Sequence, residues 1–121
     1  MVDIEERVQR LQEHLRELTV TIGERSVRLP DNLERTARYI ETFYGNLGLA
    51  VERDSYRYHD MTVANVVTRV DFTANPSRLY LLGAHYDTVG GTVGADDNAS
   101  AIAVQLETAR ELQALRANSG S

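Results

Sequence analysis

The stretch LYLLGAHYDTVGGTVGADDNASAIAVQLETAREL, residues 79–112, decides the fold of this 121-residue chain. It opens with the apolar run LYLLGA (79–84), which does not alternate with polar residues and is typical of a central strand covered on both faces. A Gly-rich loop follows, and the stretch closes with the helical pattern ASAIAVQLETAREL (99–112). A buried strand with helices before and after it indicates a layered α/β domain.

His85 and Asp87, at the end of the predicted strand, carry side chains suited to a metal site. Ligands of open α/β sheets bind at the carboxyl ends of the strands. A metal-bound His commonly donates its second ring N–H to a carboxylate, which fixes the tautomer and raises the basicity of the ligand. The sequence therefore predicts His85 as a metal ligand and Asp87 as the residue that orients it.

A second acidic cluster, Asp96-Asp97-Asn98, stands just before the helical pattern. Gly90, Gly91 and Gly94 allow the intervening loop to fold back toward the strand end. Carboxylates near a helix N-terminus are stabilised by the helix dipole and the exposed amides, so capping alone accounts for one of them. Capping does not account for the His-x-Asp before the loop, and the combination favours a metal site.

Two amphipathic helices are predicted upstream, in residues 3–19 and 31–47. Each has apolar residues spaced 4, 3, 4, 3, which places them on one helix face. Asp3 and Asp31 are the predicted N-caps. The first helix is interpreted as a packed surface helix, with a partner-binding seam as the alternative. The two apolar sets are Ile4, Val8, Leu11, Leu15 and Leu18, and Leu33, Ala37, Ile40, Tyr44 and Leu47.

Residues 49–58 and 62–70 read as two strands joined by the short turn His59-Asp60-Met61, which predicts a hairpin. His59 and Asp60 point to opposite faces if the chain is extended, so His59 is interpreted as a solvated turn residue. His14 lies on the polar side of the first predicted helix and is given no site role. The segment between the two helices, TIGERSVRLPD (21–31), is interpreted as a connector.

Composition excludes several classes of protein. The net charge of −5 gives no electrostatic footprint for nucleic acid, and the absence of Cys excludes disulfides and thiolate metal sites. No apolar stretch reaches the roughly 18 residues of a membrane span, and the N-terminus is charged where a signal peptide is apolar. The expectation is a cytoplasmic chain without membrane or nucleic-acid partners, or a secreted one if a signal was removed.

GAHYDT (83–88) and GADDNAS (94–100), followed by an Ala-rich helix, resemble the metal-binding segment of the M28 family of zinc peptidases, which includes two-metal aminopeptidases and carboxypeptidases. The layout of GLAVERDSYRY (48–58) and VANVVTRV (63–70) is similar to the start of that catalytic domain. The resemblance implies a three-layer αβα fold with a mixed sheet, here incomplete. Residues 1–121 are expected to form one partial peptidase domain, with an N-terminal helix and connector in 1–29 and the start of the catalytic core in 30–121.

The resemblance also implies roles for individual residues. His85 becomes a ligand of one zinc ion, Asp87 the residue that orients it, and Asp97 the carboxylate that bridges both Zn²⁺ ions of a complete site. The peptide bond after the bridging aspartate is often cis in such enzymes, which corresponds to Asp97–Asn98 here. Thr88 and Ala101 stand where Ser and Gly are frequent in the family.

The remaining parts of such a site, a Glu-Glu pair and a further Asp and His, find no counterpart after Asp97. The only acidic residues there are Glu107 and Glu111, and no His follows His85. A catalytic zinc usually has three protein ligands plus water, and the water needs a base to accept its proton. Two ligands cannot hold a working pair of metals, so little or no hydrolysis is expected from the isolated chain.

These residues lead to three hypotheses for function. The first is the N-terminal portion of a two-zinc exopeptidase of aminopeptidase type, which hydrolyses peptide substrates through metal-activated water. The alternative is a non-catalytic interaction module on the same scaffold, and the third is a metal-free α/β remnant. The central strand would lack later neighbours, and this predicts self-association through an exposed sheet edge.

Overall fold

The first helix begins where the sequence predicts it. The computed structural model describes residues 3–119, and in it α1 (Ile4–Arg16) is capped by Asp3, whose side chain accepts a hydrogen bond from the Glu5 amide. The helix continues into a π-helical turn, η1 (Glu17–Ile22), and ends at Gly23, which has a positive φ of 88°. The predicted apolar stripe is buried at its end, at Leu18, and exposed at its start, at Ile4.

The second helix, α2 (Pro30–Asn46), starts two residues earlier than a cap at Asp31 predicts. Its N-cap is Leu29, with no side-chain cap, so the prediction of Asp31 as the cap is wrong. Pro30 takes the first helical position because its fixed φ suits the helix and its missing N–H needs no partner there. Four of the five predicted stripe residues are buried: Leu33, Ala37, Ile40 and Tyr44.

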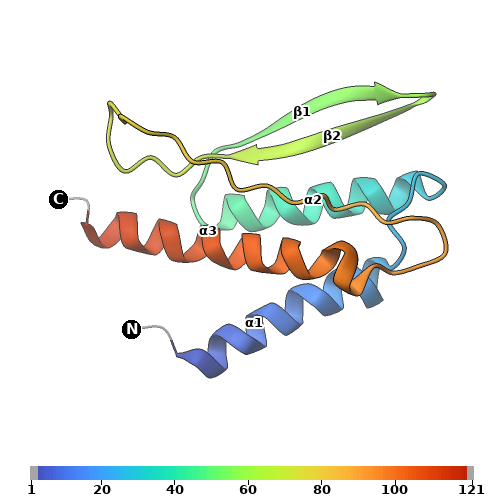
Figure 1. The fold of residues 1–121 in the computed structure, drawn as a ribbon, viewed down its shortest axis with the longest axis horizontal. Helices are drawn as coiled ribbons and strands as arrows, with labels where there is room; N and C mark the ends of the chain where they lie inside the picture. Colours follow the sequence, from blue (N-terminus) through green and yellow to red (C-terminus); the bar gives the residue numbers. More distant parts are fainter. Residues whose placement is uncertain (1–2, 120–121) are drawn as a thin grey trace.

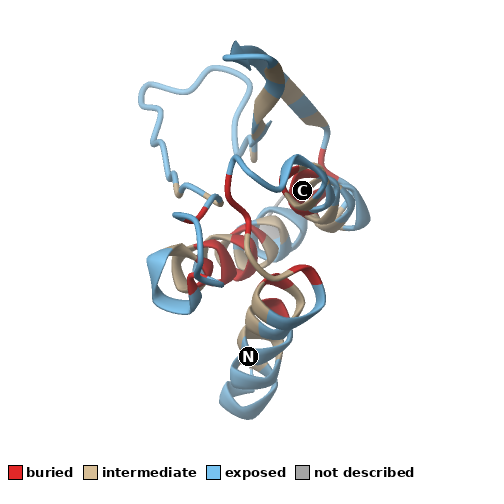
Figure 2. Cartoon of the chain, turned by 90° about the vertical axis from the view of Figure 1, so that its right-hand side faces the viewer, coloured by how far each residue is buried: buried red, intermediate tan, exposed pale blue. Residues whose placement is uncertain are grey.

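The predicted hairpin is confirmed. Strands β1 (Val51–Tyr58) and β2 (Met61–Thr68) pair antiparallel, with Val51 opposite Thr68 and Tyr58 opposite Met61. The turn consists of His59 and Asp60, and His59 has a positive φ of 52°. Both views show the hairpin on one side of the pair α2 and α3. Helix α1 lies on the opposite side of that pair (Figures 1 and 2).

The predicted central strand at residues 79–84 is wrong for this structure. The segment from residue 69 to 94 forms no helix or strand, and Figure 1 shows it as a bare trace leading to α3. Leu79 to Leu82 are all exposed, Leu81 to 96%. The physical reason is that a strand needs a neighbouring backbone to pair with, and the two strands of the described residues pair only with each other.

The third helix completes the core. A π-helical turn, η2 (Ala95–Ala99), leads into the predicted helix α3 (Ser100–Ser119), which buries Ile102, Leu106 and Ala109. Buried residues gather where the helices meet, whereas the long segment before η2 is mostly exposed (Figure 2). The chain is thus a mixed helix and strand structure, consistent with the α/β class. None of the helices within residues 3–119 is long and apolar enough to cross a membrane.

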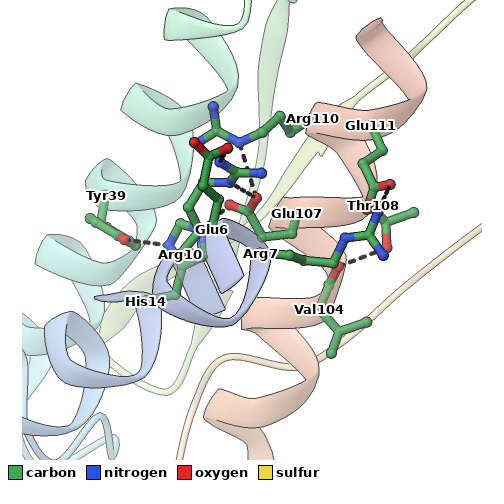
Figure 3. A network of polar contacts seen from close by, with 10 residues as sticks. All are labelled: Glu6, Arg7, Arg10, His14, Tyr39, Val104, Glu107, Thr108, Arg110 and Glu111. Atoms are coloured by element: carbon green, nitrogen blue, oxygen red, sulfur yellow. Dashed lines mark hydrogen bonds and ion pairs between the residues drawn. The ribbon is translucent and has the colours of Figure 1, made fainter. Parts of the chain in front are cut away.

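A polar cluster joins α1, α2 and α3 (Figure 3). Glu107 of α3 is 3% exposed; its carboxylate lies 2.6 Å from His14 Nε2 and 2.9 Å from Arg10 Nε, and it also pairs with Arg110. His14 Nδ1 lies 2.6 Å from the Tyr39 hydroxyl. Burial alone would raise the pKa of Glu107, but its hydrogen bonds from His14 and Arg10 bring it below the ordinary value. The interpretation of His14 as a residue of the polar face is therefore wrong, because Glu107 allows it to be buried.

Candidate functional site

His85 and Asp87 are brought together as the sequence predicts. Both lie in the segment that leads from the hairpin to α3, and His85 Nδ1 is 3.1 Å from Asp87 Oδ1. The backbone between them is fixed at Tyr86, whose hydroxyl donates a 2.8 Å hydrogen bond to the Ala64 carbonyl of β2. A carboxylate at Nδ1 holds the proton on that nitrogen and leaves Nε2 free to act as a ligand.

Asp97 approaches the other side of the same imidazole. Its Oδ1 lies 3.2 Å from His85 Nε2, so the ring stands between two carboxylates. An imidazole satisfies both only when each nitrogen carries a proton, or when a cation takes the place of the proton between Nε2 and Asp97. The arrangement thus favours a positive charge at that point.

The two donor atoms have the spacing of neighbouring ligands on one metal ion. A tetrahedral zinc with bonds of about 2.0–2.2 Å separates two of its ligand atoms by about 3.3 Å, close to the 3.2 Å found here. The side chains of His85 and Asp97 are 58% and 80% exposed, so an ion can reach them from solvent. Among residues 3–119, no group of three potential ligands is assembled for a metal. The donor set therefore fits part of a zinc site.

Local backbone geometry carries Asp97 to this position. Gly94 has a φ of 56°, and a Cβ there would collide with the Asp97 carbonyl and the Thr88 side chain. The Ala99 amide donates to the Gly94 carbonyl at 3.0 Å, which closes the turn before α3. The Asn98 amide group donates to the His85 carbonyl at 3.3 Å, and the Asp97–Asn98 peptide bond is cis, as the resemblance implies.

The connector between η1 and α2 contributes residues that sequence reasoning missed. Arg25 is fully buried and donates to backbone carbonyls of the loop that carries the site, and Thr88 pairs with the Arg25 backbone. The sequence offers little signal for this contact, because the partners of Arg25 are carbonyl groups that every residue has. A charged residue between two predicted helices is ordinarily solvated.

The other two histidines lie outside the site. His59 is exposed in the hairpin turn, where its ring packs edge-on against Tyr58. His14 is buried in the cluster around Glu107.

One protein-family model matches the part of the chain that carries the candidate site. Residues 65–120 match the family model of peptidase family M28, a segment that contains His85, Asp87 and Asp97. This segment belongs to peptidase family M28. The M28 match begins at residue 65, after the first two helices and the connector between them. Arg25 therefore lies outside it.

A curated relative extends the likeness over most of the chain. The uncharacterized protein YfbL of Escherichia coli (strain K12) is 35% identical over 112 residues, which cover 86% of this chain and 34% of that protein. The chain thus spans about a third of the length of this relative. No solved structure gave a significant match.

Proposed function

We propose that this chain is the N-terminal portion of a two-zinc exopeptidase of aminopeptidase type, and that it supplies part of the metal site. In this proposal the sequence 1–29 corresponds to the N-terminal helix and connector, and 30–121 to the start of a three-layer αβα core of the complete enzyme. The M28 match supports the peptidase assignment. The observation that carries the metal assignment is the 3.2 Å approach of His85 Nε2 to Asp97 Oδ1, with Asp87 on the other ring nitrogen.

Each of the three residues has a distinct task in this proposal. His85 would hold zinc through Nε2, and Asp97 would supply a carboxylate oxygen as a further ligand. Asp87 accepts the Nδ1 proton and fixes the tautomer of His85. When bound, the metal supplies a water of lowered pKa that can attack a peptide bond. The general base and the remaining ligands would have to come from residues other than those described here.

The exposed run at residues 79–84 supports the larger fold. It borders an open groove of about 1260 Å³ between the hairpin and the helices. A strand in this place would gain backbone partners from an adjoining segment and would cover the apolar floor of the groove. The floor is formed by Leu33, Ile40, Tyr44, Val66, Ile102 and Leu106.

Zinc binding by the purified chain tests the proposal. We expect one weak site, measured by competition with a chromophoric chelator, which is lost in His85→Ala and in Asp97→Ala. His59→Ala is the matched control, because it removes an exposed imidazole outside the site. We also expect no zinc-dependent hydrolysis of an aminoacyl anilide, because the base is missing. Binding that survives His85→Ala, or robust hydrolysis by the chain, contradicts the proposal.

The second candidate function is a non-catalytic interaction module. It is favoured by the same exposed run, since unpaired backbone next to an apolar groove promotes association between chains. Light scattering checks this, and Leu81→Asn should shift associated chains toward monomer because Leu81 is 96% exposed. Lack of zinc binding together with association through this run would favour the module over the peptidase.

A further inference from the structure

Arg25 is the one arginine of the connector between η1 and α2 that is fully buried. Its guanidinium donates hydrogen bonds to five backbone carbonyls at 2.7 to 3.3 Å. The acceptors are the carbonyls of Leu18, Gly23, Tyr86, Val93 and Gly94. A planar guanidinium, with five donors in a fixed fork, is the side chain best able to serve so many acceptors at once.

Three of these carbonyls, those of Tyr86, Val93 and Gly94, lie on the two arms of the loop that carries the candidate metal ligands. Tyr86 immediately follows His85, and Gly94 stands three residues before Asp97. One rigid cation therefore ties the arm of His85 to the arm of Asp97, and both arms to the end of η1. Residues 85–94 have no helix or strand to fix them, so the two arms are joined by contacts such as this tie and the hydrogen bond from Asn98 to the His85 carbonyl.

The backbone of the connector adds a second set of contacts. The Arg25 amide donates to the Thr88 hydroxyl at 3.1 Å, and the Thr88 amide donates to the Arg25 carbonyl at 2.9 Å. At the loop tip, the Gly91 amide donates to the Glu24 carboxylate at 3.0 Å. The connector thus contacts the loop at three places: at Thr88, at Gly91 in the loop tip, and at Val93 and Gly94.

Burial of the charged Arg25 guanidinium costs desolvation free energy. Burial lowers the pKa of its guanidinium, and the negative charge of nearby Asp87 opposes this change. No carboxylate forms an ion pair with Arg25 among the described residues, so its charge is met by carbonyl dipoles. A buried charge of this kind is retained where it fixes a conformation that an apolar residue would leave loose.

We infer that Arg25 is a positioning residue of the metal centre: it fixes the separation of His85 and Asp97 and thereby sets the affinity for zinc. The inference rests on the proposed function for its metal. Arg25 touches neither ligand side chain, and it acts through the backbone on which both are carried.

The test compares Arg25→Lys with Arg10→Met in the same chain. Lys keeps the charge but gathers its donors on one nitrogen, which cannot reach five carbonyls. Arg10 is a matched control, because its bonds go to Glu107 and Glu6, away from the loop. We expect zinc affinity to fall at least about tenfold in Arg25→Lys, as for loss of other groups that orient metal ligands. Arg10→Met should keep its zinc affinity while it loses stability.

A second readout without metal separates the two proposals. Hydrogen exchange at the Thr88 and Ala99 amides reports the loop directly, and we expect faster exchange in Arg25→Lys and unchanged exchange in Arg10→Met. Folded Arg25→Lys protein with wild-type zinc affinity overturns the positioning role. A wild-type chain that binds no zinc, with exchange that still accelerates in Arg25→Lys, overturns the proposed function and leaves Arg25 as the residue that fixes the loop.

A milder pair of variants covers the case in which Arg25→Lys does not fold. Thr88→Val removes the hydroxyl that accepts from the Arg25 amide, and Thr88→Ser retains it. We expect Thr88→Ser to bind zinc more tightly than Thr88→Val, with circular dichroism confirming that both are folded. Equal zinc affinities in the two variants would contradict the inference.

Discussion

Two halves of one irregular segment behave differently. Residues 79–84 are apolar and, except for the half-buried Ala84, exposed, and no hydrogen bond to them is found within residues 3–119. Residues 85–94 are as irregular in backbone, yet hydrogen bonds from Arg25, Thr88 and Asn98 hold them in place. The difference indicates that the connector before α2 holds the candidate site in place. The position of the site does not require a strand at residues 79–84.

The largest expected difference between the two halves is in hydrogen exchange. The amides of Thr88 and Ala99 are bonded to the Arg25 and Gly94 carbonyls, whereas those of Tyr80 to Leu82 have no partner among the described residues, 3–119. We expect the bonded amides to exchange at least about 100-fold more slowly, because exchange there requires local opening. Amide-resolved exchange by NMR measures this, and similar rates in both halves would show that the connector does not fix the loop.

Glycine substitutions sharpen the comparison through stability. Gly94→Ala places a Cβ against the Asp97 carbonyl and the Thr88 side chain at a φ of 56°. Overpacking and the left-handed backbone together should cost about 2–4 kcal/mol of unfolding free energy.

The matched control for this substitution is Gly83→Ala, in residues 79–84. A Cβ at Gly83 meets nothing within 4 Å. Its effect should stay within about 0.5 kcal/mol. Urea denaturation checks both variants, and equal costs would remove the distinction between the halves.

The helices were predictable because burial of one face imposes a period that the sequence displays. The second stripe is buried from Leu33 to Tyr44, whereas the first is buried only at its end, at Leu18. The hairpin was predictable from two strand-like runs and a short turn. Residues 79–84 were not, because an apolar run shows only that a segment favours burial, whereas strand formation depends on a partner backbone.

The residues of the candidate site also fall into some that could be predicted from the sequence and some that could not. His85 and Asp87 were predicted from side-chain chemistry and spacing and Asp97 from the family resemblance, and the structure brings the three side chains together. Arg25 was not found, because its acceptors are backbone carbonyls from three separate parts of the chain. His14 was misplaced because its partner Glu107 lies 93 residues away in sequence.

The smallest effect concerns the loop tip and depends on pH. Hydrogen bonds from Arg28 and Ser26 lower the pKa of Glu24 to about 2, and the Gly91 amide adds to this shift. A carboxyl group whose pKa is lowered by folding stabilises the fold above its unfolded pKa, near 4.5, and that contribution is lost as the pH falls toward 2.

Glu24→Gln should therefore be less stable than wild type at pH 6, and the difference should shrink between pH 4.5 and 2. Urea midpoints across this range measure it. A difference that stays constant with pH would show that the Glu24 charge does not hold the tip.

The most direct test of the metal centre is the imidazole nitrogen spectrum of the chain during zinc titration. His85 should carry its proton on Nδ1 and show a metal-induced shift at Nε2, because Asp87 accepts from one nitrogen and Asp97 faces the other. His14 and His59 serve as internal controls and should not change. An unchanged His85, or a shift confined to His59, would contradict the assignment of His85 and Asp97 as zinc ligands.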